Sequence, residues 1–118
     1  MKASELRIGN YLQDKALDKW FSVTSQLIFD YDRLQLQNHV KPIPLTEEWL
    51  LKFGFSIIKS IYNDNIYFHE IRPELEIRLI GEEYDLGIET EWLSEIKHVH
   101  QLQNLYFALT GEELTIKQ

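Results

Sequence analysis

The chain has 118 residues, of which 44% are hydrophobic and 13% aromatic, with no cysteine and a formal net charge of −7. This composition excludes a disordered chain, and the lack of cysteine excludes disulfides, thiolate metal sites and thiol nucleophiles. The length suits a single domain over residues 1–118, with a core that needs no cross-links. The first residues lack the apolar centre of a signal peptide, so we expect a cytoplasmic protein without membrane contact.

The net charge is concentrated between residues 70 and 95. That segment holds nine acids against Arg72 and Arg78, which sums to −7, whereas the remaining ten acids are balanced by ten bases. Charge segregated in this way affects which partners a protein attracts or repels. The acids of the segment are Glu70, Glu74, Glu76, Glu82, Glu83, Asp85, Glu89, Glu91 and Glu95.

The N-terminal third predicts a hairpin followed by a further strand. The Gly9-Asn10 pair is typical of a turn, and residues 20–24 are β-branched and aromatic, which favours a strand. Hydrophobic residues alternate at the start of segment 27–37, so we predict a strand there, with a short helical turn as the alternative.

Residues 46–53 predict a short helix. Thr46 can cap its first turn, and Glu47 and Glu48 would lie near the positive end of the helix dipole. Gly54 can adopt the left-handed conformation that ends a helix. The boundaries of this helix are therefore marked at both ends.

The segment from Phe55 onward is typical of successive antiparallel strands. Residues 55–61 and 66–71 flank an Asn/Asp turn, and residues 75–80 and 84–92 flank a turn at 81–83. Since side chains alternate along a strand, the last two strands should have one buried and one charged face. The predicted buried set is Leu75, Ile77, Leu79, Leu86, Ile88 and Trp92. The predicted opposite set is Glu76, Arg78, Asp85, Glu89 and Glu91.

Residues 98–110 predict a second helix, because their hydrophobic residues recur at helical spacing and Gly111 lies where the helix would end. The expected fold class is α+β. We predict an antiparallel sheet of about six to seven short strands, with the two helices, 46–53 and 98–110, packed on one face.

Three blocks of the sequence carry a resemblance. They are residues 6–11 (LRIGNY), 41–55 (KPIPLTEEWLLKFGF) and 98–114 (HVHQLQNLYFALTGEEL). These blocks resemble a family of small uncharacterised proteins from gut-type Bacteroidetes bacteria and their phages or prophages. The resemblance implies no activity, ligand or catalytic residue. It implies a setting, namely an accessory protein of a mobile element inside a bacterial cell.

The sequence offers no motif to which catalysis, a cofactor or a metal can be assigned. His98 and His100 would point about 200° apart on a helix, without a third ligand nearby in sequence. His69-Glu70 lacks the second histidine of the zinc-protease motif, and the glycines are too scattered to form a phosphate-binding loop. We therefore predict no cofactor and favour a non-catalytic protein.

The charge and the aromatic residues also indicate which partners the chain can bind and which side chains form its core. The isoelectric point near 5.0 and the scattered bases argue against direct nucleic-acid binding. Trp20, Trp49 and Trp92 stand in apolar surroundings, so we expect all three in the core.

The acidic sheet face has two interpretations. It is either a solvated surface that keeps the protein soluble, or a face that binds a basic protein partner, such as a nucleic-acid-binding protein, in competition with phosphate. The second interpretation predicts a protein-binding module of unknown oligomeric state. The alternative is a small enzyme or ligand-binding domain with a pocket between the sheet and the C-terminal helix. The candidate partner-binding residues are Glu74, Glu76, Asp85, Glu89 and Glu91.

Overall fold

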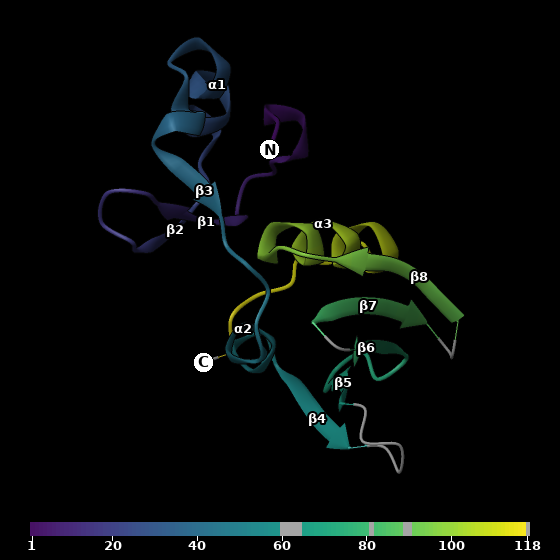
Figure 1. Ribbon diagram of the computed structural model, residues 1–118. Helices are drawn as coiled ribbons and strands as arrows, with labels where there is room; N and C mark the ends of the chain where they lie inside the picture. The colour runs from purple at the N-terminus through teal and green to yellow at the C-terminus, as the bar shows by residue number, and fades with distance from the viewer. Residues whose placement is uncertain (60–64, 81, 89–90, 118) are drawn as a thin grey trace. The chain divides into compact units, whose positions relative to one another are not determined.

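The structure is a computed structural model that describes residues 1–59, 65–80, 82–88 and 91–117 (Figure 1). Most of the predicted Asn/Asp turn, Gly81 of the next turn and Glu89 lie outside the described residues. Contacts group the chain into two compact units. Unit 1 comprises residues 1–44 and 98–113, and unit 2 comprises residues 45–97 and 114–118. The single domain expected from the length stays a prediction.

The α+β class is confirmed. The described residues form eight strands in two antiparallel sheets, one of three and one of five strands, together with three α-helices. The sequence had predicted one sheet of six to seven strands and two helices. None of the described helices is long and apolar enough to cross a membrane.

Unit 1 contains the smaller sheet, in the order β2-β1-β3. The antiparallel pairing of β1 with β2 confirms the predicted N-terminal hairpin. Hydrophobic residues from the strands, from α1 and from the N-terminal segment form its core: Leu6, Leu12, Val23, Tyr31 and Val40. The elements are η1 (Ala3–Glu5), β1 (Tyr11–Asp14), β2 (Trp20–Ser22), α1 (Ser25–Arg33), η2 (Leu36–Asn38), β3 (Val40–Pro42) and α3 (Val99–Thr110).

The strand predicted over residues 27–37 is wrong, because most of this segment is helical. The Thr24 side chain caps α1 by accepting a hydrogen bond from the Leu27 amide at 3.2 Å. Gln35 has a φ of 53°, the left-handed conformation, between α1 and η2. Of the α1 residues only Tyr31 is fully buried. The alternating hydrophobic residues therefore belong to a helix that buries a narrow face, and not to a strand.

Unit 2 contains the larger sheet, a meander in the order β4-β5-β6-β7-β8 with β4 and β8 at its edges. Every neighbouring pair is antiparallel, as the sequence predicted for this segment. The elements are α2 (Glu47–Lys52), β4 (Phe55–Lys59), β5 (Asn65–His69), β6 (Leu75–Ile80), β7 (Glu83–Ile88) and β8 (Glu91–Ile96).

Helix α2 confirms the predicted start and stop signals. The Thr46 hydroxyl accepts the Trp49 amide at 3.4 Å, and Gly54 follows the helix with a φ of 89°. The Tyr67 hydroxyl of β5 donates to the Glu47 carboxylate of α2 at 3.3 Å. Burial is the main cause that raises the pKa of Tyr67 to about 12, so this hydroxyl remains a donor at neutral pH.

Helix α3 confirms the second predicted helix, and Gly111 ends it with a φ of 74°. Two amide side chains tie it to the segment that leads into β1. Gln103 accepts from the Tyr11 amide at 2.8 Å and donates to the Gly9 carbonyl at 3.0 Å. Asn104 accepts from Asn10 at 2.9 Å. We call these contacts the amide seam.

Replacement of Gln103 by leucine should destabilise unit 1 strongly. The change leaves the partly buried Tyr11 amide and Gly9 carbonyl without these partners, at up to about 1–3 kcal/mol for each group. Urea unfolding followed by circular dichroism measures the loss. Gln37→Leu is the control, because the Gln37 side chain is exposed and should leave the midpoint nearly unchanged. Equal midpoints for the two variants would show that the seam does not stabilise the fold.

Candidate functional site

Strand pairing sorts the side chains of the five-stranded sheet onto two faces. One face, which we call the helix face, carries Tyr67, whose hydroxyl contacts Glu47 of α2. It also carries the buried residues Leu75, Ile77 and Leu86, which confirms the predicted buried face for these three. Leu79 and Ile88 share this face and are half-buried. We call the opposite side the Trp92 face. Its members are Ser56, Ile58, Ile66, Phe68, Glu76, Arg78, Ile80, Glu83, Asp85, Gly87, Trp92 and Glu95.

The predicted position of Trp92 on the buried face is wrong. The single strand predicted over residues 84–92 is two antiparallel strands, β7 and β8, and Trp92 of β8 lies opposite Gly87 while Glu91 lies opposite Ile88. Because β7 and β8 are separate antiparallel strands, the alternation along β7 does not continue into β8, so Trp92 lies on the charged face and Glu91 on the helix face. Farther along β8 the register shifts by one residue, a β-bulge that places Glu95 opposite Asp85 on the charged face. Trp92 is 36% exposed.

Trp92 is held between a glycine and an arginine. A Cβ atom at Gly87 would lie 2.7 Å from the Glu91 carbonyl oxygen and 2.7 Å from Cε3 of the Trp92 ring. The guanidinium carbon of Arg78 lies 4.0 Å from the centre of that ring, within the range of a cation–π contact. The indole thus covers bare backbone on one strand and contacts a cation on another.

Carboxylates surround this pair on the Trp92 face. Asp85 lies opposite Arg78 on one side and opposite Glu95 on the other. Glu76 lies opposite Gly87, and Glu83 lies opposite Ile80. The face therefore carries four carboxylates and one cation within strands β6, β7 and β8.

The two units differ greatly in charge. Unit 2 has twelve acids and six bases, a net charge of −6, and unit 1 has seven acids and six bases, a net charge of −1. The charge segregation seen in the sequence thus coincides with a structural boundary. A basic partner would experience its main electrostatic attraction to unit 2.

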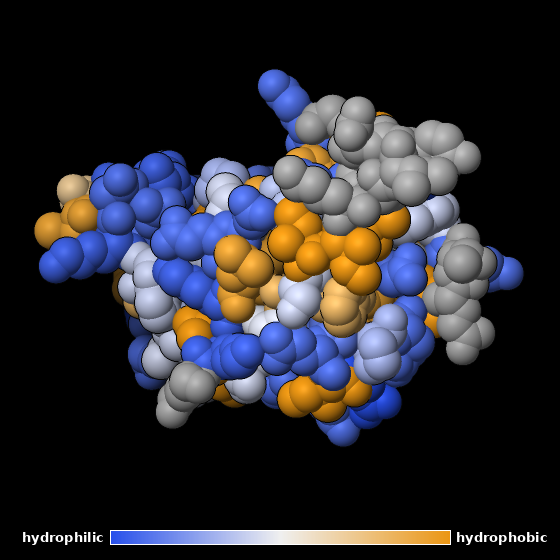
Figure 2. Space-filling view, turned by 90° about the horizontal axis from the view of Figure 1, so that it is seen from below, coloured by the Kyte–Doolittle hydropathy of each residue, from blue (hydrophilic) through white to orange (hydrophobic). Residues whose placement is uncertain are grey.

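Exposed hydrophobic side chains accompany the carboxylates. Ile58 is 53% exposed and Leu93, the extra residue at the bulge, is 50% exposed, and Ile80 is also exposed. A space-filling view shows hydrophobic side chains gathered beside hydrophilic ones on one side of the molecule (Figure 2). The Trp92 face is therefore a mixed surface, with aromatic and aliphatic groups among acids.

The five candidate residues from the sequence lie in different places. Glu76 and Asp85 share the Trp92 face, as predicted. Glu74 lies in the turn before β6, where its carboxylate is 3.8 Å from Arg72. Glu91 is exposed on the other face, and Glu89 is outside the described residues. The sequence interpretation missed Glu95, which the bulge places opposite Asp85, and Trp92, which lies in β8 opposite Gly87.

His69 fixes the turn that carries Glu74. Its Nδ1 accepts hydrogen bonds from the amides of Ile71 and Arg72, each at 3.2 Å, and its Nε2 lies 3.1 Å from the Phe53 carbonyl oxygen. This pattern requires a neutral ring with its proton on Nε2. Burial is the main cause that lowers the pKa of His69.

The predicted divergence of His98 and His100 is wrong. His98 is the extended residue before α3 and not part of the helix, so the two rings stack with centroids 5.8 Å apart. His100 is buried, neither ring nitrogen has a hydrogen-bond partner, and Nε2 lies 3.7 Å from the Glu5 carboxylate. Burial is the main cause that lowers its pKa.

Within the described ranges, histidine and carboxylate side chains form no group of three that could hold a metal ion.

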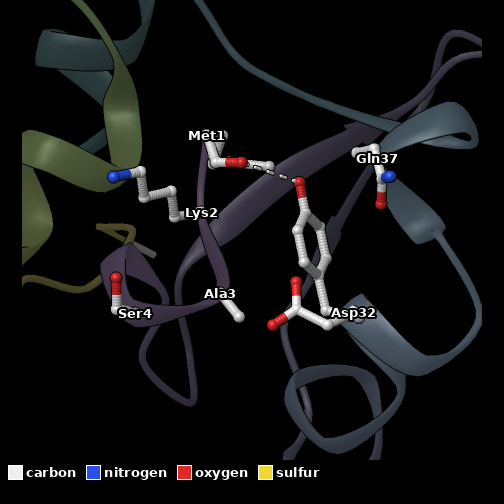
Figure 3. Close-up of a pocket in the computed structure, with 7 residues that line it drawn as sticks. Met1, Lys2, Ala3, Ser4, Asp32 and Gln37 are labelled. Atoms are coloured by element: carbon white, nitrogen blue, oxygen red, sulfur yellow. Dashed lines mark hydrogen bonds between the residues drawn. The ribbon is translucent and has the colours of Figure 1, made fainter.

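Unit 1 has an open pocket of about 490 Å³ (Figure 3). The Tyr31 hydroxyl in it donates to the Met1 carbonyl oxygen at 3.2 Å. The lining is largely polar, with the side chains of Lys2, Ser4, Asp32 and Gln37 beside Tyr31. The lining residues are Met1, Lys2, Ala3, Ser4, Tyr31, Asp32 and Gln37.

The other two tryptophans also differ from each other. Trp49 of α2 is buried, as predicted, whereas Trp20 of β2 is 47% exposed and packs edge-on against Tyr11. The expectation of three core tryptophans is therefore correct only for Trp49.

Comparison of the chain with protein-family models, with curated proteins and with solved structures finds no match.

Gly87→Ala should destabilise unit 2 by about 1–3 kcal/mol, because the added methyl group overlaps a carbonyl oxygen and the indole. Urea unfolding measures this loss, with Ser94→Ala as the control in the same sheet. In the double variant Gly87→Ala/Trp92→Ala, part of the overlap is removed, so the two changes should cost less than their sum. Strict additivity would contradict the packing of the ring on Gly87.

Acid should destabilise unit 2 through His69. Its pKa in the folded protein lies below the ordinary value of 6.5, so the unfolded chain takes up a proton before the folded chain does. The free energy of unfolding should therefore fall as the pH drops below about 6.5. Urea unfolding at about pH 7.5 and about pH 5.5 measures the fall, which should be smaller for His69→Asn. His100 contributes equally in both proteins, so an equal fall would contradict the role of His69.

Proposed function

We propose that this chain is a non-catalytic protein-binding module that engages a basic protein through the Trp92 face. The observation that carries the proposal is the exposed indole of Trp92 among four carboxylates, in the unit with a net charge of −6. Exposed hydrophobic groups beside acids fit a partner that offers both apolar contact and positive charge.

The aromatic and charged side chains of the Trp92 face would contribute to binding in different ways. Tryptophan and arginine are the residues that most often provide binding energy at the centre of an interface. Trp92 and Arg78 contact each other, so their geometry is already set before a partner arrives. The carboxylates would steer the encounter and select positive charge, an effect that salt weakens.

A nucleic-acid-binding protein is the class of partner that fits best. Its binding surface is basic because it neutralises phosphates, and rows of carboxylates can compete for that surface. The resemblance to mobile-element proteins suggests a setting inside a bacterial cell. There the chain would act as an accessory protein that occupies a host or phage protein.

Capture from bacterial lysate tests the proposal. The immobilised chain should retain basic proteins at low salt and release them at high salt, and added DNA should reduce capture. Glu76→Lys/Glu95→Lys should reduce capture at least about tenfold, because it removes two carboxylates and adds two repelling charges.

Asp32→Lys/Glu112→Lys is the matched control, since it makes the same change of net charge within unit 1. It should retain capture. Equal loss of capture in both variants would show that only the net charge of the chain matters. No loss of capture in either variant would refute the role of the Trp92 face. Circular dichroism of each variant verifies that it is folded.

A further inference from the structure

We propose that the basic partner contributes an extended segment that adds to the sheet as a further strand beside β8. This inference rests on the proposed function and specifies how the same part of unit 2 would hold its partner. It assigns recognition to the backbone of β8 as well as to side chains.

The first argument is the open edge of the sheet. β8 is the last strand in the order of the sheet and pairs with β7 on one side. All of its residues except Ile96 are exposed. Backbone groups on the outer side of such a strand form a template for another chain.

The second argument is the charge of that edge. Within β8 the charged residues are Glu91 and Glu95, and no base lies among them. A second copy of β8 would bring like charges together, which disfavours self-pairing. A segment with lysine or arginine brings opposite charges, so the edge selects a basic partner and rejects its own copy.

The third argument is the position of the two carboxylates. Glu95 continues the row of Arg78 and Asp85 across the Trp92 face, so a base opposite Glu95 would lie near two carboxylates. Glu91 lies opposite Ile88, on the helix face. An added strand would thus meet a carboxylate on each of its two faces, and its apolar side chains could contact Trp92.

The other edge of the sheet lacks this selectivity. β4 contains no carboxylate, and its exposed residues include Ile57 and Ile58. A basic segment would gain hydrogen bonds there but no charge attraction from the strand itself. The proposal therefore predicts binding at β8 and not at β4.

A pair of synthetic peptides tests this inference on the full chain. One is a short peptide of lysine and valine residues, and the other has the same sequence with alternate backbone nitrogens methylated. Methylation keeps the charge and the side chains but removes the donors needed for strand addition. The change in tryptophan fluorescence on addition of peptide measures affinity at low salt, and NMR amide exchange locates the contact.

The unmethylated peptide should bind at least about tenfold more tightly than its methylated counterpart, and should slow exchange of amides within residues 91–96. Glu91→Lys/Glu95→Lys should abolish binding, whereas Asp32→Lys/Glu112→Lys should not. Equal binding of the two peptides would overturn strand addition while leaving a side-chain-only interface intact. Slowed exchange in β4 instead of β8, or no binding of either peptide, would also overturn the inference, and the lysate capture would then decide the proposed function separately.

Discussion

The composition of the Trp92 face depends on a single steric constraint, the absence of a side chain at Gly87. A Cβ atom there would overlap both the Glu91 carbonyl and the Trp92 ring. With glycine, the indole of Trp92 can lie over the bare backbone of the residue opposite it, where Arg78 contacts it. A larger side chain at position 87 would displace the indole from this place and remove its contact with Arg78.

The elements that the sequence predicted correctly have local signals at their ends. Thr46 and Gly54 mark α2, Gly111 marks the end of α3, and polar turn residues separate the strands of the meander. Helix α1 was misassigned because its hydrophobic residues alternate over a short stretch and only Tyr31 is fully buried. The division into two sheets was not predictable, since it depends on contacts between residues far apart in sequence.

The candidate site was predictable only as far as strict alternation holds. Glu76 and Asp85 lie in β6 and β7, where the predicted alternation holds, and were placed correctly. Trp92 and Glu91 lie in β8, which the sequence had joined to β7 as one strand, and were exchanged. The isolated Gly87 within an apolar strand was the available signal, since glycine inside a strand often marks a bulge or a close approach. The buried amides of α3 gave no such signal, because a polar residue on a helix is normally assigned to its solvent side.

The amide seam also bears on the order in which the chain can fold during synthesis. The sheet of unit 2 is a meander, so each strand pairs with its neighbour in sequence and can form as soon as it is made. In unit 1, Gln103 bonds residues more than ninety positions earlier. The contacts of α3 with the residues before β1 can therefore form only after the strands of unit 2 have been synthesised, although the hairpin of β1 and β2 can pair earlier.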